Sequence, residues 1–308
     1  MSQTNTSNEP SGVLLVHKHA GVTSHDIVGK VRRLYGTRRV GHTGTLDPMA
    51  TGLLVVLIGR AAKASEYLVT DTKRYRARLR LGLTTDTEDT TGTVLTTSEQ
   101  LPNEQALQAM LPHFCGRIQQ IPPMYSALKV HGQKLVDLAR QGVVIEREAR
   151  PIEIFSLRAS STECPSDYLL EVHCSGGTYI RTLCADLGAA LGCGGAMAAL
   201  ERTETGGFSL SDAHTVDELE ALSLEERLSL LIPTEALFAC LPEVQLPKFY
   251  ETLCRNGCEI YQKKLGTAHS TDTRVRLSTA NGSFFGLGEV REYPDGSAIK
   301  AIKLFSLT

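Results

Sequence analysis

The amino-acid sequence predicts an α+β protein in which one large domain precedes a smaller one. The chain has 308 residues with 42% apolar content, which is enough to bury a sizeable core. Strand patterns and helix patterns are mixed along the chain as far as Ala236. From Leu241 onward, short strand-like runs are separated by turn signals at Asn281-Gly282 and Asp295-Gly296. About the last 68 residues are therefore expected to form a small all-β domain.

The first expected elements are a strand and a helix. Gly12 to His17 (GVLLVH) is an apolar run that predicts the first strand. A helix follows, capped by Thr23 or Ser24 and ending near Gly36, because hydroxyl side chains cap helix starts and glycine favours helix ends. The cations of this helix are candidate phosphate contacts.

The next stretch, GHTGTLDPMATGLLVVLI, surrounds a single carboxylate, Asp47, with glycines and threonines. The proline after Asp47 favours extended backbone at that residue, so we expect Asp47 to lie on a loop. Leu53 to Ile58 is an uninterrupted apolar run, which is typical of a fully buried strand. An ordinary Asp-Pro turn is the alternative, but a carboxylate beside a central strand is costly unless it is paired.

A short helical segment is expected from Ala61 to Leu68, followed by a strand from Lys73 to Gly82 (KRYRARLRLG). Cations at positions 74, 76, 78 and 80 alternate with Tyr75 and apolar residues, which predicts one basic face and one apolar face. Tyr75 lies on the apolar face, so its hydroxyl requires a buried partner. From the pattern alone, a plain core tyrosine is the alternative.

The following region predicts a helix over Leu101 to Phe114 and a short helix over Lys134 to Arg140. The short helix belongs to a segment that is either an RNA-gripping loop or a plain surface insertion. Tyr168 to Cys174 predicts a strand, and a helix that starts near Tyr179 then positions Arg181. On the pattern alone, Arg181 is equally a surface cation.

Two further segments complete the large domain. Gly194 to Phe208 (GGAMAALERTETGGF) predicts a helix that ends at a glycine pair, with Leu200 as a core residue by default. Ser211 to Ala236 carries seven acids and one arginine, which predicts a solvated helical cover.

The charge of the chain is distributed unevenly. Between Leu14 and Gly82 there are 13 Lys and Arg against four Asp and Glu, a local net charge of +9. The remainder must carry −11, because the whole chain has a formal charge of −2. A solvated charged face is one explanation. The position of the excess around Asp47 favours a polyanionic substrate whose binding weakens with salt.

Several classes of function find no support in the sequence. It contains no GxxxxGK[ST] pattern and no strand followed by GxGxxG, so no nucleotide cofactor is expected. Its eight cysteines form no CxxC pair and no zinc-like spacing with histidines, so no metal is expected. The polar N-terminus resembles no signal peptide and no apolar run reaches membrane-spanning length, which predicts a cytoplasmic protein that does not bind membranes.

Several of these stretches together resemble the pseudouridine synthases of the TruB type, which act on position 55 in the T-loop of tRNA. The resemblance covers roughly Gly12 to Phe208 and rests on GVTSHDIVGKVRR, the Asp47 loop, KRYRARLRLG, IPPMYSALK with REARP, and GTYIRTL, in that order. It implies a mixed, largely antiparallel central sheet flanked by helices. It also implies, more weakly, that the last residues form a β-barrel-like RNA-binding domain of the PUA type.

The resemblance implies a domain organisation and a partner. Residues 1–10 would be a disordered tail, residues 11–238 the catalytic domain, and residues 239–308 the PUA-like domain. An RNA-gripping insertion would lie near residues 124–150. The expected partner is the T-arm of tRNA, and we expect a monomer.

The resemblance also assigns roles to individual residues, without a cofactor. Asp47 matches the family's nucleophile, and Arg181 matches the cation that keeps it ionised. Tyr75 matches the residue that stacks on the flipped uracil base. Four further residues match substrate contacts: His42, which takes the vacated place in the T-loop, Tyr179, the apolar wall Leu200, and Lys63.

The chain departs from the family pattern at three places, one of which is the C-terminal segment AIKAIKLF, which lacks a proline that is often found there. Histidines flank Lys18 where an acid or Asn and a proline are common, which is expected to affect only local structure. Glu201 stands where a second basic residue is usual, which puts affinity for tRNA in question.

Two rival functions remain open on the sequence. A nucleoside or glycoside hydrolase also uses a carboxylate at the sugar, but it usually needs a second carboxylate. A catalytically idle tRNA-binding or tRNA-folding protein would bind and flip the base without chemistry.

Overall fold

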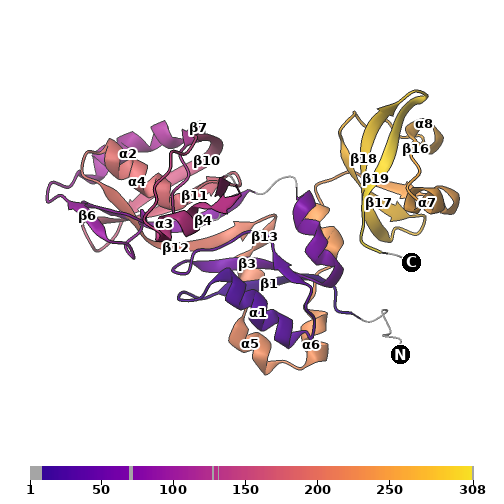
Figure 1. The fold of residues 1–308 in the computed structure, drawn as a ribbon, viewed down its shortest axis with the longest axis horizontal. Helices are drawn as coiled ribbons and strands as arrows, with labels where there is room; N and C mark the ends of the chain where they lie inside the picture. Colours follow the sequence, from indigo (N-terminus) through magenta and orange to yellow (C-terminus); the bar gives the residue numbers. More distant parts are fainter. Residues whose placement is uncertain (1–8, 69–71, 127, 131, 307–308) are drawn as a thin grey trace.

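The computed structural model describes residues 9–68, 72–126, 128–130 and 132–306. Figure 1 shows an elongated molecule in which a small C-terminal domain lies at one end of a larger domain. The tail predicted for residues 1–10 falls mostly on residues 1–8, which lie outside the described part. No helix of the described residues is both long enough and apolar enough to cross a membrane.

The described part of the large domain is built on a ten-stranded sheet with the order β14-β1-β3-β12-β4-β11-β10-β7, in which β2 also pairs with β3 and β13 with β12. The strands are β1 (Gly12–Lys18), β2 (Val40–His42), β3 (Thr51–Ile58), β4 (Lys73–Leu81), β7 (Gly116–Gln120), β10 (Arg150–Ser161), β11 (Asp167–Cys174), β12 (Gly195–Thr205), β13 (Phe208–Ser209) and β14 (His214–Thr215). The pairs β1–β14 and β3–β12 are parallel and the other pairs are antiparallel. This confirms the predicted mixed, largely antiparallel sheet.

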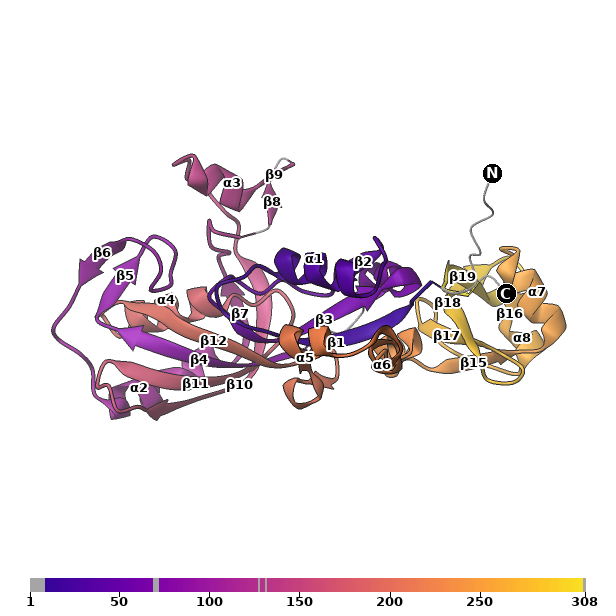
Figure 2. The same ribbon diagram turned by 90° about the horizontal axis from the view of Figure 1, so that it is seen from below.

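Helices and two hairpins surround this sheet. The helical segments are α1 (Ser24–Leu34), η1 (Gly59–Tyr67), α2 (Glu104–Met110), η2 (Leu111–Phe114), α3 (Leu135–Arg140), α4 (Ile180–Ala190), η3 (Leu210–Asp212), α5 (Val216–Ala221), α6 (Leu224–Ser229) and η4 (Thr234–Phe238). The hairpins are β5 (Leu83–Thr85) with β6 (Val94–Thr97), and β8 (Lys129–Val130) with β9 (Gln133–Lys134). In Figure 2 the second hairpin and α3 project from the same side of the domain as α1.

The starts of the helices follow from local sequence. Thr23 caps α1 in a capping box with Asp26, as the sequence predicts for a hydroxyl followed three residues later by an acid. The acidic segment after β13 contains two more capping boxes, formed by Thr215 with Glu218 and by Ser223 with Glu226. The predicted helical cover is therefore present, as a series of short helices.

The helix predicted for Gly194 to Phe208 is wrong, because this segment forms β12 in the middle of the sheet. Its alanines and glutamates favour a helix locally. Burial overrides that preference, since β12 fills the gap between β3 and β4 and pairs with both. Gly52 of β3 permits this fit: it has a φ of +104°, and a Cβ there would lie 2.3 Å from the carbonyl oxygen of Arg202.

Helix α4 packs unusually closely on β12, and this contact positions its N-terminal end. A Cβ on Gly188 would lie 2.1 Å from the backbone nitrogen of Gly195, so only glycine fits there. The first turn of α4 is buried from Ile180 to Cys184 and includes Arg181. The guanidinium group is therefore delivered from a rigid element.

The small C-terminal domain contains a five-stranded sheet with the order β15-β17-β18-β19-β16. The strands are β15 (Glu243–Leu246), β16 (Ile260–Tyr261), β17 (Arg274–Thr279), β18 (Phe284–Tyr293) and β19 (Gly296–Leu304), and the helices are α7 (Lys248–Arg255) and α8 (Gln262–Leu265). The predicted turns at Asn281-Gly282 and Asp295-Gly296 join β17 to β18 and β18 to β19. The small β domain is confirmed. The expectation that it would be all-β is wrong, because it also contains the helices α7 and α8.

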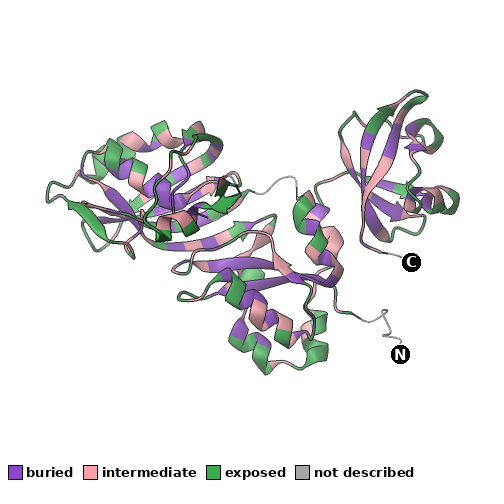
Figure 3. Cartoon of the chain, in the orientation of Figure 1, coloured by how far each residue is buried: buried purple, intermediate pink, exposed green. Residues whose placement is uncertain are grey.

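The two domains share a hydrophobic cluster. Aliphatic residues of β1, β3 and η1 pack with Phe238 from the connecting segment and with Phe305 from the C-terminal domain. Arg276 of β17 also forms an ion pair with Glu235, at 2.7 Å. Figure 3 shows continuous buried segments in the strands of both domains, whereas the outer helices are mostly exposed. The C-terminal domain is thus packed against the large domain rather than tethered to it.

Candidate active site

A cleft of about 660 Å³ opens between the Asp47 loop, the N-terminal ends of α1 and α4, and the α3 insertion. Six of the seven residues assigned by the resemblance line it: His42, Asp47, Tyr75, Tyr179, Arg181 and Leu200. Lys63 does not line it, because Lys63 lies on the exposed side of η1. Lys134 and Arg140 of the insertion also line the cleft, so cations reach it from a segment distant in sequence.

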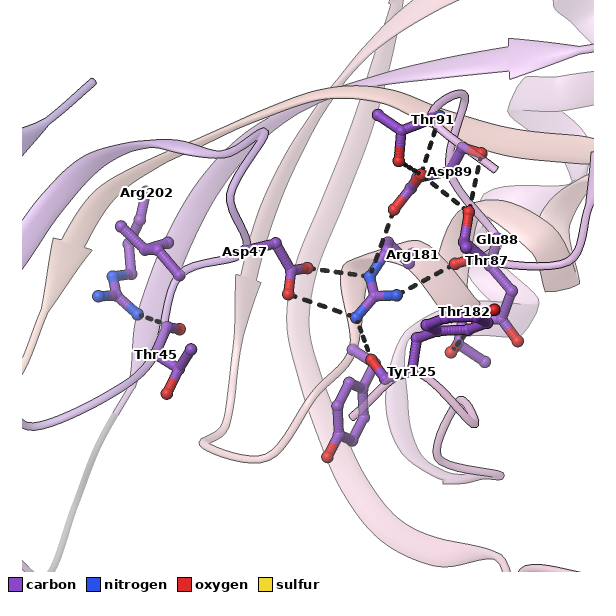
Figure 4. A network of polar contacts seen from close by, with 12 residues as sticks. Thr45, Asp47, Thr87, Glu88, Asp89, Thr91, Tyr125, Arg181, Thr182 and Arg202 are labelled. Atoms are coloured by element: carbon purple, nitrogen blue, oxygen red, sulfur yellow. Dashed lines mark hydrogen bonds and ion pairs between the residues drawn. The ribbon is translucent and has the colours of Figure 1, made fainter. Parts of the chain in front are cut away.

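Asp47 and Arg181 both line this cleft. Figure 4 shows that they form an ion pair with each other. The Nε atom of Arg181 lies 2.9 Å from one carboxylate oxygen of Asp47, and its second amino group donates to the other oxygen at 3.4 Å. The Arg181 side chain is only 7% exposed, whereas that of Asp47 is 34% exposed. The pair thus presents a carboxylate, not a cation, to whatever occupies the cleft.

Backbone carbonyls hold the guanidinium of Arg181 in place. Its two terminal nitrogens donate to the carbonyl oxygens of Thr87 at 3.1 Å and Tyr125 at 2.7 Å. Thr87 lies after β5 and Tyr125 lies at the base of the insertion. Arg181 therefore joins the Asp47 loop, the β5–β6 hairpin and the insertion around one side chain.

A second carboxylate, Asp89, lies behind Arg181. Its nearer oxygen is 3.9 Å from the Nε atom of Arg181, and the side chain is buried. The hydroxyls of Thr87 and Thr91 both donate to Asp89. In the sequence this segment reads TTDTEDTTG, and its acids flanked by threonines are a usable signal of a hydrogen-bonded carboxylate.

The Asp47 loop is fixed from below by two buried polar side chains. The hydroxyl of Ser24 donates to the carbonyl of Leu46 and accepts from the backbone N–H of the same residue, at 3.1 and 2.8 Å. The amine of Lys18 donates to three carbonyls, including that of Pro48 at 3.3 Å. Burial lowers the pKa of Lys18 to about 8, against the opposing effect of the Asp47 charge. The departure from the family pattern concerns the histidines that flank Lys18. Lys18 itself is a structural residue, because its amine is bonded beside the loop.

The sides of the cleft are formed by an aromatic, an aliphatic and a neutral polar side chain. Tyr75 and Leu200 are buried on neighbouring strands β4 and β12. His42 is half buried, and its Nδ1 atom is shielded from solvent without a hydrogen-bond partner in the described part. Burial lowers the pKa of His42, and the charge of Arg202 lowers it further, so the ring is neutral at neutral pH.

Tyr179, the residue that immediately precedes α4, also lines the cleft. Both of its backbone groups are bonded to the side chain of buried Gln120, at 2.8 and 3.0 Å. These two bonds hold the backbone of Tyr179, the N-cap residue of α4, whose own side chain makes no capping hydrogen bond. No local pattern indicates this role of Gln120, because its partner lies 59 residues away in the sequence.

The basic face of β4 does not line the cleft. Arg74, Arg76 and Arg80 point to the opposite side of the sheet from Tyr75, because side chains alternate along a strand. They lie beside acids of the neighbouring strands, including Glu201, whose carboxylate is 3.9 Å from Arg76. The expectation that the cations of β4 surround the site is thus wrong for these arginines, whereas Lys73 does line the cleft. Glu201 belongs to the rear face.

No group of three His, Cys, Asp or Glu side chains in the described residues is arranged to ligate a metal ion. The chemistry available in the cleft is that of one accessible carboxylate, its guanidinium partner, aromatic rings and a neutral imidazole.

Two family models match the chain. The model described as TruB family pseudouridylate synthase (N terminal domain) matches residues 32–180, and the tRNA pseudouridylate synthase B C-terminal domain matches residues 181–239. The chain is 45% identical to the tRNA pseudouridine synthase B of Thiobacillus denitrificans, over 90% of this chain and 91% of that one. The chain belongs to the TruB family. The predicted family is therefore confirmed, and with it the class of pseudouridylate synthases.

Other proteins are similar to this TruB family member over nearly its whole length. The tRNA pseudouridine synthase B of Clostridium kluyveri is 40% identical over 96% of this chain and 99% of its own. Among solved structures, the Cbf5-Nop10-Gar1 complex contains a chain with a TM-score of 0.73 and 24% identity, covering 96% of this chain and 85% of that one. This structural likeness supports the pseudouridine synthase fold.

Proposed function

We propose that this TruB family member isomerises uridine to pseudouridine at position 55 in the T-loop of tRNA, with Asp47 as the nucleophile. The observation that carries the proposal is the ion pair in the cleft, in which Arg181 is buried and Asp47 is accessible. The names of the relatives, tRNA pseudouridine synthase B, support tRNA as the substrate. No cofactor takes part.

The reaction breaks the bond between N1 of uracil and the sugar and forms a bond from C5 of the base to the same sugar carbon. The proton on C5 is then released to water and N1 takes up a proton, so the product is an isomer of the substrate and the reaction needs no oxidant or energy source. Asp47 supplies an anionic oxygen for a transient bond to the substrate, and the two contacts from Arg181 orient the carboxylate. The carbonyls of Thr87 and Tyr125 keep the guanidinium from moving away with the substrate.

The target base must leave its stack in the T-loop to reach Asp47, at a cost of a few kcal/mol. Tyr75 stacks on the extruded base, and stacking on an aromatic ring is worth about 1–3 kcal/mol. Leu200 and Tyr179 bound the base on other sides, since both line the same cleft. His42 takes the place of the base in the T-loop, for which a neutral ring is suited because it stacks without a charge to be desolvated.

We further propose that residues 11–238 form the catalytic domain and residues 239–308 a PUA-like RNA-binding domain. The insertion at residues 124–150 would grip the T-arm, which is supported by Lys134 and Arg140 at the edge of the cleft. Lys63 would contact tRNA outside the cleft, from the exposed side of η1. The enzyme would act in the cytoplasm as a monomer and would need neither a membrane nor a metal.

A hydrolase would require a second carboxylate that can reach the substrate. Asp89 is the nearest candidate, but its side chain is buried, is bonded to two threonines and does not line the cleft. The geometry therefore favours isomerisation over hydrolysis.

The proposal is tested with tRNA that carries tritium at C5 of its uridines. Isomerisation releases tritium to water, hydrolysis releases free uracil, and a protein that only binds and refolds tRNA releases neither. A panel of tRNAs with uridine or cytidine at position 55 identifies the site. Tritium release that is independent of position 55 would contradict the T-loop assignment.

A further inference from the structure

Arg202 is a buried cation on the other side of Asp47 from Arg181 (Figure 4). The residue is 1% exposed, and no carboxylate of the described residues lies within ion-pair distance of its guanidinium. Its partners are three backbone carbonyl oxygens: those of Leu53 at 2.8 Å, Gly44 at 3.0 Å and Thr45 at 3.5 Å. A buried charge with only neutral partners is costly, so its position requires an explanation.

The three carbonyls belong to the two ends of the Asp47 loop. Gly44 and Thr45 precede Asp47, whereas Leu53 lies in β3 just after the loop. One rigid guanidinium fork therefore fixes both ends of the loop relative to β12. The backbone of Arg202 also lies directly against Gly52, where a Cβ would come within 2.3 Å of the Arg202 carbonyl oxygen.

The core alone does not require this arginine. Leu53 is buried within β3, and β3 is already paired with β1 from Gly52 to Ile58. The residues that Arg202 adds to this framework are Gly44 and Thr45, whose loop has no strand partner. Its contribution is thus specific to the segment that carries the nucleophile.

We propose that Arg202 is a positioning residue for Asp47: its guanidinium holds the two ends of the loop so that the carboxylate faces Arg181 and the substrate. The inference rests on the proposed function, because it concerns the placement of the proposed nucleophile. Arg202 reaches the wall of the cleft, but its guanidinium donates to loop carbonyls and, among the described residues, forms no ion pair with Asp47.

The first test is Arg202→Met, which keeps the length of the side chain and removes its donors. We expect the single-turnover rate of tritium release to fall about a hundredfold, because small displacements of a reacting group have costs of that order. The dissociation constant for tRNA should change less than about threefold, because Arg202 is buried. A rate loss below about tenfold, or an equal weakening of tRNA binding, would overturn the proposal.

A second variant decides the question if the first does not fold. Arg202→Lys keeps the buried charge, but a single ammonium group cannot reach both ends of the loop as a fork does. We expect a rate loss of at least about tenfold in this folded variant, and a smaller loss overturns the proposal. In Arg202→Ala, added ethylguanidinium should restore part of the lost rate, which a general loss of stability would not allow.

Arg80→Met is the matched control, because Arg80 lies on the neighbouring strand but on the face away from the cleft. It should lose stability and keep its rate at a temperature where it is folded. Wild-type protein that released no tritium would overturn the proposed function, and the inference with it. An active wild type with an undiminished Arg202→Met rate would overturn the inference alone.

Discussion

Among the aspartate–arginine pairs of the described residues, the two shortest have similar distances and opposite burial. In the cleft, Asp47 and Arg181 approach to 2.9 Å, and the side chains are 34% and 7% exposed, respectively. On the far side of the sheet, Asp167 and Arg80 approach to 2.8 Å, and the side chains are 1% and 38% exposed, respectively. The cation is the buried partner in the first pair and the anion is the buried partner in the second.

This reversal separates a catalytic pair from a structural one. The guanidinium of Arg181 has carbonyl partners of its own, so Asp47 is free to turn its oxygen toward a substrate. Both carboxylate oxygens of Asp167 instead accept hydrogen bonds from Arg80, and this pair joins β11 to β4. The chemistry of the two residues is the same, and the partner that remains accessible decides what the pair can do.

The largest expected effect comes from the accessible anion. Asp47→Asn should reduce tritium release by about 10⁴-fold or more, because the amide is neither anionic nor nucleophilic. Binding of tRNA should persist, since most of its affinity comes from phosphate contacts. Single-turnover tritium release and filter binding check the two parts, and turnover near the wild-type rate would remove Asp47 as the nucleophile.

The next effect comes from its partner. Arg181→Lys should reduce the rate of tritium release by about 10²–10³-fold. A single ammonium group cannot contact both carboxylate oxygens of Asp47 and also donate to the two carbonyls. The free energy of unfolding should fall as well, since those carbonyls lose donors. An undiminished rate of tritium release in this variant would exclude Arg181 from the site.

The structural pair should show the opposite pattern. Asp167→Asn should lower the free energy of unfolding by about 1–2 kcal/mol at neutral pH, because two charge-assisted hydrogen bonds are weakened, and leave the rate unchanged. The hydrogen bond from Arg80 lowers the pKa of Asp167 below its usual 3.8. This stabilisation is therefore fully present above about pH 4 and is lost as the pH falls through the lowered value.

Urea unfolding of wild type and Asp167→Asn from pH 7 to pH 2.5 measures this dependence. The difference in free energy of unfolding between the two proteins should be constant at neutral pH and shrink below about pH 4. A difference that grows on acidification would contradict the assignment.

The smallest effect is expected on the rear face of the sheet. Glu201 is 3.9 Å from Arg76, and both side chains are substantially exposed, so solvent screens their attraction. Glu201→Gln should change the free energy of unfolding by less than about 0.5 kcal/mol. The dissociation constant for tRNA, measured by filter binding, should also change by less than about twofold. A larger gain in affinity would mean that RNA reaches this face.

Local patterns in the sequence predicted the elements that depend on neighbours in the chain. The loop of Asp47, the buried strand after it and the cap at Thr23 are set by residues within a few positions. The pairing of Asp47 with Arg181 came from the resemblance to a family, because 134 residues separate them. The local elements and the family resemblance were both predictable because each depends on residue types within short stretches of sequence.

The remaining features depend on distant parts of the chain. β12 was expected to be a helix because its alanine-rich sequence carries no sign of the sheet around it. Asp89, Lys18 and Arg202 bind backbone carbonyls or distant side chains, and such partners leave no pattern near the residue itself. The ion pairs that occupy the basic face of β4 were missed for the same reason.

The central claim is that the accessible anion, and not the presence of an aspartate–arginine pair, marks the catalytic centre. The most direct test is the ratio of the tritium-release rates of Asp47→Asn and Asp167→Asn, measured with the same tRNA where both are folded. The structure predicts background release for the first variant and a rate close to wild type for the second. Equal rates in the two variants would contradict it.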